Sequence, residues 1–179
     1  MFKLASQKRN PGLTRVPTRT ITTLLVITLA VAAYAAVNFK SGPNFSIPIS
    51  TFSLFTTGEL SGLGGAAHVT VDAKGTADGS CTNKGGNLVP VQAATVGASG
   101  SQTVSPDGNG KANFMVTSNP VASPNPCPSG NWTFDITSVT YTSATVNVST
   151  SGKQMLSDTF TLNGCTSDST TNVSCTRTP

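Results

Sequence analysis

The sequence predicts an all-β protein, a single immunoglobulin-like β-sandwich preceded by one N-terminal hydrophobic helix. Three observations support this. Apolar and polar residues alternate in several segments, a period of two that is typical of half-buried strands. Clusters of Gly, Pro, Asn and Asp separate these segments about every 10 to 15 residues. One long uncharged stretch, residues 20–39, lies near the N-terminus. A small barrel is the competing architecture.

The leader, residues 1–37, carries five basic residues and no acid: Lys3, Lys8, Arg9, Arg15 and Arg19. Positive charge before an apolar segment keeps the N-terminus in the cytoplasm, so everything after Lys40 is expected to be exported. Two fates fit. The segment is a signal peptide cut after a small-residue site at 33–35 or 35–37. Alternatively, 20 residues at about 1.5 Å each reach the roughly 30 Å of a hydrocarbon core, and the segment stays as an anchor.

The positive charge is confined to this leader. The whole chain has a net charge of +4 and a pI near 9.0. After residue 37 there are six basic and seven acidic residues, so 6 minus 7 gives −1. Without a basic cluster to displace counterions, the exported part is not expected to bind nucleic acid.

The exported part divides into three regions. Residues 38–57 read as a linker with an edge strand, because Phe45, Ile47 and Ile49 alternate and Pro48 lacks an N–H for pairing. Residues 58–164 form the predicted sandwich. Residues 165–179 read as a Ser/Thr-rich tail.

Within the sandwich, the first clear strand starts at Ala67 and continues toward Cys81. The K-G-G-N segment at 84–87 ends it, and a strand of small residues follows at 93–104. The P-D-G-N-G turn at 106–110 precedes another alternating strand at 111–117, and a Pro-rich loop runs to Pro128.

The longest alternation, residues 131–148, contains the only Trp of the chain. Trp132, Phe134 and Ile136 occupy every second position and are predicted to face the core. The phase then slips, which predicts a bulge near Thr137 and Ser138 that returns later apolar residues to the same face. A hairpin turn at 150–153 leads into the returning strand.

Four cysteines in an exported chain imply two disulfides, with three connectivities open. Pairing Cys81 with Cys127 ties the loop after the first clear strand to the Pro-rich loop. Pairing Cys165 with Cys175 closes a short C-terminal ring. This connectivity is favoured.

Three N-x-S/T sequons are candidate glycosylation sites: Asn44, Asn131 and Asn172. A fourth, at Asn147, falls inside a predicted strand and is the least plausible acceptor. A chain rich in Asn, Ser and Thr also forms such triplets by chance.

No catalytic, cofactor-binding or metal-binding set is predicted, and no cofactor. His68 is the only histidine and sits at a polar position of its strand, as a surface histidine does. One histidine excludes multi-histidine zinc or copper sites. Asp135 is the acid considered for a glycosidase pair, but no partner acid stands out. Asp107 belongs to a turn, because the full ligand set of a calcium loop is missing.

Three segments carry a resemblance: C-T-N-K-G-G-N at 81–87, P-N-P-C-P at 124–128 and N-W-T-F-D-I-T-S-V-T-Y-T-S-A-T-V at 131–146. They resemble a family of small secreted β-sandwich proteins of no known activity, over about residues 58–162. The resemblance implies a signal segment, one sandwich and the Cys81–Cys127 bond. The tail with Cys165 and Cys175 departs from the family pattern.

These observations favour an extracellular or cell-surface domain with a structural or binding role. The alternative is a secreted hydrolase or carbohydrate-active protein, which requires His68 or a carboxylate pair in a cleft. A carbohydrate-binding module is a weaker third reading, because exposed aromatic residues are few. The expected partner is the membrane, through an uncleaved leader; any protein or glycan partner is unspecified.

Overall fold

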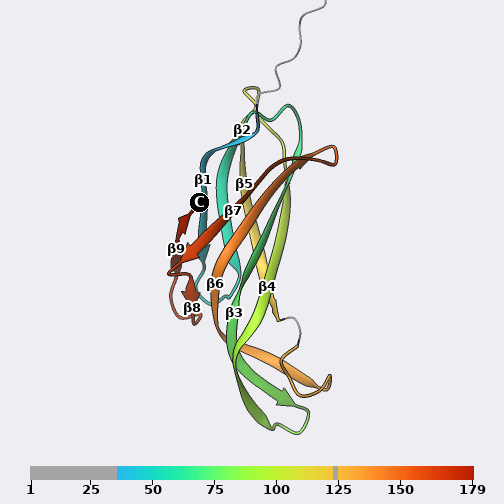
Figure 1. The fold of residues 1–179 in the computed structure, drawn as a ribbon, viewed down its shortest axis with the longest axis vertical. Coiled ribbons are helices and arrows are strands. Elements are labelled where there is room, and N and C mark those ends of the chain that lie inside the picture. Colours follow the sequence, from blue (N-terminus) through green and yellow to red (C-terminus); the bar gives the residue numbers. More distant parts are fainter. Residues whose placement is uncertain (1–35, 123–124) are drawn as a thin grey trace, which may run out of the picture. The chain divides into compact units, whose positions relative to one another are not determined.

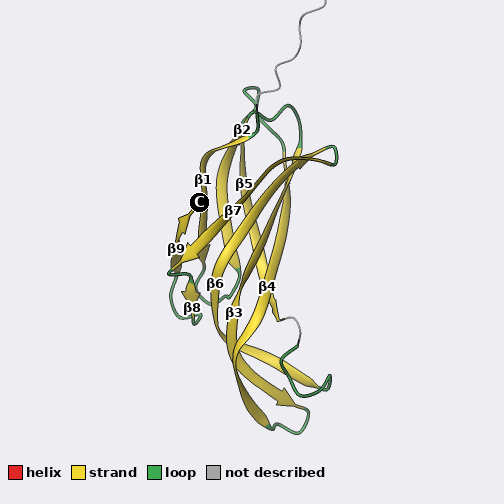
Figure 2. Cartoon of the chain, viewed as in Figure 1, coloured by secondary structure: helices red, strands yellow, loops and turns green. Residues whose placement is uncertain are grey.

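The computed structural model describes residues 36–122 and 125–179, so the leader and its predicted helix lie almost wholly outside the described residues. This part of the chain is all-β, as predicted (Figure 2). Its nine strands are β1 (Asn38–Ile47), β2 (Leu54–Ser61), β3 (Ala67–Asn83), β4 (Leu88–Val104), β5 (Ala112–Ala122), β6 (Trp132–Thr150), β7 (Lys153–Asn163), β8 (Thr166–Ser167) and β9 (Val173–Thr178). No helix among the described residues has the length and hydropathy needed to cross a bilayer.

Eight of these strands form a closed ring. The hydrogen-bonded order is β3-β4-β5-β2-β1-β9-β7-β6, and β6 pairs back with β3 (Figure 1). Every pairing in the ring is antiparallel, and β8 is an additional short neighbour of β6. The described residues therefore form a closed barrel, the competing architecture, in place of the two separate sheets expected of an immunoglobulin-like sandwich.

Two strands turn the corners of the ring by changing partners along their length. Residues 112–118 of β5 pair with β2, and residues 119–122 pair with β4. In β9, residues 173–175 pair with β1 and residues 176–178 with β7. These changes of partner join two curved sheets into one barrel.

The regions predicted to flank the sandwich are instead parts of this barrel. β1 has β2 on one side and β9 on the other, so it is not an edge strand. Pro48 falls just after β1, where its missing N–H leaves the ladder intact. The predicted tail supplies β9. Its Arg177 donates a 2.9 Å hydrogen bond to the carbonyl of Gly42 and lies 5.1 Å from the ring centroid of Phe160.

The bulge predicted in the longest alternation is present. Asp78 of β3 pairs with Ser138 while Gly79 pairs with Ile136, so Thr137 is the extra residue. A second shift leaves Thr142 unpaired between Ser143 and Tyr141. These two bulges let one 19-residue strand curve around the barrel while its apolar residues keep facing inward.

The predicted turns also form. Ser151 and Gly152 both have positive φ, 48° and 77°, as a two-residue hairpin of type I′ requires between β6 and β7. The K-G-G-N segment links β3 to β4, and there the Asn83 Oδ1 atom accepts hydrogen bonds from the amides of Gly85 and Asn87.

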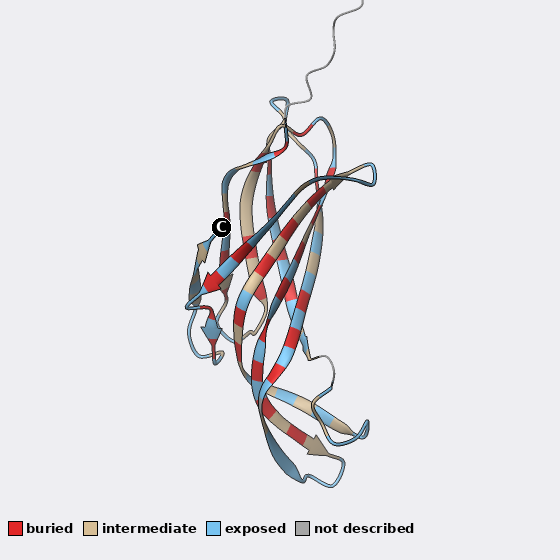
Figure 3. Ribbon diagram, in the orientation of Figure 1, coloured by how far each residue is buried: buried red, intermediate tan, exposed pale blue. Residues whose placement is uncertain are grey.

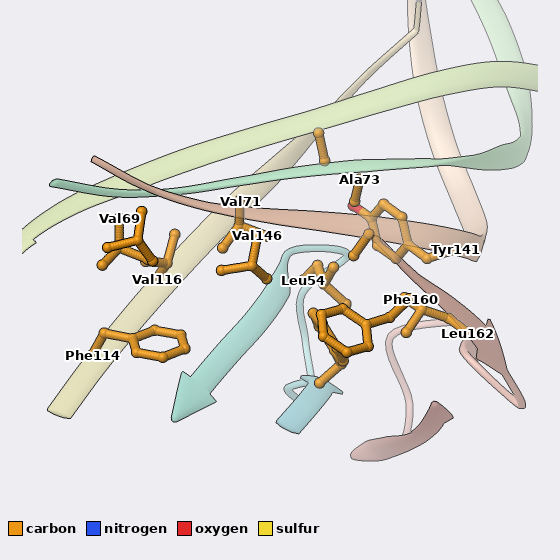
Figure 4. Packing of buried hydrophobic residues seen from close by; sticks show 14 of the residues in the cluster. Leu54, Val69, Val71, Ala73, Phe114, Val116, Tyr141, Val146, Phe160 and Leu162 are labelled. Carbon is orange, nitrogen blue, oxygen red and sulfur yellow. The ribbon is translucent and has the colours of Figure 1, made fainter. Parts of the chain in front are cut away.

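The barrel interior is filled by apolar side chains from all eight strands of the ring, some of which Figure 4 shows. Figure 3 marks the buried positions along each strand. Between β1, β5 and β7 the rings of Phe39, Phe45, Phe114 and Phe160 pack with centroids 5.7 to 6.2 Å apart. The side chains of Trp132, Phe134 and Ile136, all predicted to face the core, are only half-buried, because the start of β6 extends beyond the closed ring.

Of the residues described, four with hydroxyl groups are also buried, and one of them, Ser167, accepts a 3.1 Å hydrogen bond from the amide of Ser169. Tyr141 donates a 2.9 Å hydrogen bond to the carbonyl of Phe52, and burial raises the pKa of its phenol above the ordinary value of 10.0. Ser118 donates to the carbonyl of Val71 at 3.4 Å. Thr56 is fully buried, and among the described residues its Oγ1 has no hydrogen-bond partner. The interior is thus apolar with one unsatisfied hydroxyl.

Candidate functional site

His68 lies on the outer face of β3 and is exposed. Its Nδ1 atom is 3.3 Å from the Thr103 hydroxyl on β4, and this is its only side-chain hydrogen bond in the described part of the chain. A triad-type hydrolase needs an acid on one side of the imidazole and a nucleophile on the other. Thr103 lies beside the Nδ1 atom of His68, where a catalytic triad would need an Asp or a Glu.

The carboxylates considered earlier have local structural partners. Asp135 is exposed on β6 and accepts a 3.0 Å hydrogen bond from the Thr82 hydroxyl. Asp107 accepts hydrogen bonds from the amides of Asn109 and Lys111, both at 2.9 Å, and these amide donors lower the pKa of its carboxyl group. The 106–110 segment is thus a turn closed by its aspartate, as predicted.

No group of three or more His, Cys, Asp or Glu side chains suited to a metal ion occurs within residues 36–122 and 125–179. The ion pair found there joins Lys40 to Glu59, at 2.8 Å across β1 and β2. The hydrogen bond that Lys40 donates to the Glu59 carboxylate raises the pKa of the exposed Lys40 ammonium.

The cysteines form Cys81–Cys127 and Cys165–Cys175, the connectivity that the sequence favours. Their Cα atoms lie 5.6 Å and 4.7 Å apart. The first bond attaches the loop before β6 to the far part of β3. The second joins the segment after β7 to β9, so it helps to hold the last strand of the barrel in place.

The sequons occupy different settings. Asn44 is exposed on β1, and Asn131 is exposed in the turn that precedes β6. Asn172 is exposed just before β9, and its Oδ1 atom accepts a hydrogen bond from the amide of Ile49. Asn147 is half-buried within β6, where its Oδ1 atom accepts a 2.6 Å hydrogen bond from the Ser157 hydroxyl.

A cleft of about 630 Å³ lies at the end of the barrel where the leader joins. Small residues and the β6–β7 hairpin line it: Val37, Gly62, Gly64, Gly65, Ala66, Thr150, Ser151, Lys153 and Met155. Lys153 is the only charged side chain among these residues. The lining therefore lacks the convergent polar groups that a specific small-molecule site needs.

At the opposite end, three strands continue past the ring and form what we call the distal extension, residues 78–83, 88–91 and 132–138 (Figure 1). Pairing aligns Val89, Cys81 and Phe134 across one face, with Val91, Gly79 and Ile136 in the next row. Leu88 is 66% exposed on the other face. The extension is thus a three-stranded ribbon with apolar groups in reach of solvent.

The sequence gives only an indirect sign of this extension. The alternation predicts strands that include Cys81 and Trp132, but no local pattern indicates that β3 and β6 extend beyond the ends of the strands beside them. Comparisons of the chain with protein-family models, with curated proteins and with solved structures give no match.

Proposed function

We propose that this chain is an exported domain that acts at or beyond the outer face of the cell membrane through contacts of its surface. The observation that carries the proposal is the pairing of all four cysteines in disulfides. Disulfides persist in oxidising compartments and are rare in the cytosol. The basic leader with its uncharged stretch supports the same destination.

The filled interior supports a structural or binding role. Small eight-stranded barrels either hold a ligand inside or fill the interior with side chains. Here Val69, Val71, Phe114, Tyr141 and Val146 meet in the interior (Figure 4). Contacts with a partner therefore fall to the outer faces, the loops and the distal extension.

The strand topology places the point where the leader enters at one end of the barrel and the distal extension at the other. β1 begins beside the end of β2, where Asn38 pairs with Ser61, so the leader joins the barrel at this end. β3 runs from the same end for 17 residues, which at about 3.3 Å per residue is about 55 Å. The distal extension therefore lies at the end of the barrel opposite the one at which the chain enters it.

The alternative of a secreted hydrolase receives no specific support. It depends on His68 or on a carboxylate pair in a cleft. His68 contacts Thr103 on an open strand face, and the cleft at the leader end is lined by no acid. Glu59 and Asp107 both line a hollow of about 330 Å³, but Glu59 is paired with Lys40 and Asp107 accepts the amides of its own turn.

N-linked glycans fit the proposed location. Asn44 and Asn131 expose their amides, and Asn172 uses only its Oδ1 atom, so attachment at Nδ2 leaves its hydrogen bond to Ile49 in place. These three remain the candidate sites. Glycans there would cover β1, the turn before β6 and the approach to β9.

Surface labelling of intact cells tests the proposal. A membrane-impermeant amine reagent is expected to modify Lys84, exposed in the β3–β4 turn, without cell lysis. Intact mass before and after reduction is expected to differ by four hydrogens, and enzymatic removal of glycans reports their number. A chain labelled only after lysis, with four free thiols, would contradict export.

A further inference from the structure

Ring closure leaves free strand edges in the distal extension. The last β4–β5 pair joins Val96 to Ala122, so residues 88–95 of β4 pair only with β3. β8 reaches β6 only at Val139 and Thr140, so residues 132–138 of β6 also pair only with β3. Each of these segments therefore has one side with no strand beside it among the described residues.

The two edges differ in how open they are to a further strand. The β4 edge contains Pro90, which has no N–H, and Ala93, whose φ of 52° interrupts the extended backbone. Both features are ways in which proteins blunt exposed edges. The β6 edge has neither, and its sequence W-T-F-D-I-T-S is rich in residues that favour strands.

The β6 edge is also self-complementary. In antiparallel pairing of two copies, directly opposite side chains share a face of the sheet. With Phe134 opposite Phe134 of the second copy, Trp132 faces Ile136, and Thr133 faces Asp135. This register places aromatic and β-branched side chains together on one face. On the other face, each hydroxyl lies opposite a carboxylate, and no like charges meet.

We propose that two copies of this chain associate through residues 132–136 of β6, in antiparallel pairing centred on Phe134. The pairing joins two three-stranded extensions into one six-stranded sheet. It continues the apolar rows through Cys81 and Phe134 and through Gly79 and Ile136 across both copies. The proposal does not depend on export, and it assigns the distal extension to self-association.

The association is expected to be weak, because the interface is small. Five paired residues from each copy are far fewer than the 20 to 30 per side of a standard stable interface. A dissociation constant between about 1 µM and 1 mM is therefore expected. Two copies held in one membrane by uncleaved leaders would meet at higher effective concentration.

The test measures association of the full chain in detergent micelles by sedimentation equilibrium, using protein made without N-glycosylation so that Asn131 is unmodified. Thr133→Asp places a carboxylate opposite Asp135 of the second copy at two symmetric positions, and is expected to weaken association about tenfold at low salt. Thr133→Lys creates two opposite-charge pairs and is expected to tighten it by about the same factor.

Thr95→Asp is the matched control, because it makes the same change at an exposed threonine on the β4 edge. It is expected to leave association unchanged. In a parallel measurement, exchange of those amides of residues 132–136 that do not hydrogen-bond to β3 should slow as protein concentration rises.

Three results would overturn the proposal. One is a monomer up to about 1 mM. Another is an equal effect of the Thr133→Asp and Thr95→Asp variants, which would place the contact elsewhere. The third is strong protection, in the dilute monomer, of those amides of residues 132–136 that do not hydrogen-bond to β3, which would mean that the edge is already occupied within one chain.

Discussion

The unsatisfied hydroxyl of Thr56 offers the sharpest test of the barrel interior. Thr56 lies on β2 opposite Val116 of β5, with none of its surface exposed, and its Oγ1 atom has no partner among the described residues. Valine has nearly the same shape and replaces the hydroxyl with a methyl group. Thr56→Val therefore removes the unsatisfied group without opening a cavity.

The expected gain follows from the cost of burying an unpaired hydroxyl, about 1 to 3 kcal/mol. The methyl group is slightly larger than the hydroxyl, and tight packing offsets part of this gain. We therefore expect the free energy of unfolding to rise by about 1 to 2 kcal/mol. For a domain of this size that corresponds to an increase in Tm of about 4 °C per kcal/mol.

Urea titration of the full chain with intact disulfides measures the change, with circular dichroism and Trp132 fluorescence compared to establish a single transition. Thr57→Val is the matched control: its side chain is half-exposed, and its effect should stay within about 0.5 kcal/mol. If Thr56→Val lowers stability while Thr57→Val does not, the buried hydroxyl must be hydrogen-bonded, for instance to an internal water, and the reasoning fails.

Three further changes test other parts of the barrel. Gly100→Ala should lower the free energy of unfolding by about 2 kcal/mol or more in urea titration, because a Cβ there would clash with the backbone of β5. At Gly97 a Cβ would lie 4.0 Å from the Ala73 carbonyl oxygen, an ordinary van der Waals contact, so Gly97→Ala should change stability by less than about 1 kcal/mol. Tyr141→Phe should be less stable at pH 8, and its gap to the parent should narrow above about pH 10. Burial keeps the Tyr141 phenol protonated in the folded state, whereas the phenol of the unfolded chain ionises above about pH 10. The parent therefore loses the stability that Tyr141 contributes as the pH rises, and Tyr141→Phe has no such contribution to lose. A difference in Tm between the two proteins that stays constant from pH 8 to above pH 10 would contradict this explanation. Replacing Cys81 and Cys127 together by Ala should lower the free energy of unfolding by about 4 kcal/mol, because this disulfide closes a loop of 46 residues. Replacing Cys165 and Cys175 should lower it by only about 2.7 kcal/mol, because the separation is 10. Equal losses would argue that the disulfides do not stabilise the fold by closing loops in the unfolded chain.

Local features of this fold follow from local sequence. The alternation of Ala67, Val69 and Val71 identifies a half-buried strand because successive side chains point to opposite faces. The phase slip at Thr137 predicts the bulge, since only an extra residue keeps the later apolar side chains inside. The turns at 106–110 and 150–153 also follow from local sequence. The first is closed by the Asp107 carboxylate, and the second depends on positive φ at Ser151 and Gly152.

The site-related predictions divide in the same way. The position of His68 on a polar strand face can be inferred from its neighbours, and the structure places it there. The distal extension and its free β6 edge cannot be inferred, because an edge is defined by where other strands end. Half-burial of Trp132 has the same origin: its alternation is that of a core strand, but the ring closes before reaching it.

By itself, the sequence determined that this protein is built from strands, where most of them turn, where β6 bulges, and that a basic, apolar leader precedes them. Only the tertiary structure decided that the strands close into a barrel, that β1 is an inner member of it, and that the last residues supply β9. The physical reason is that alternation records which side of a strand is buried, whereas strand neighbours are set by backbone hydrogen bonds between segments far apart in the chain. β1 and β9, separated by more than 120 residues, pair because both have unfilled edges there, and neither segment carries a local sign of the other.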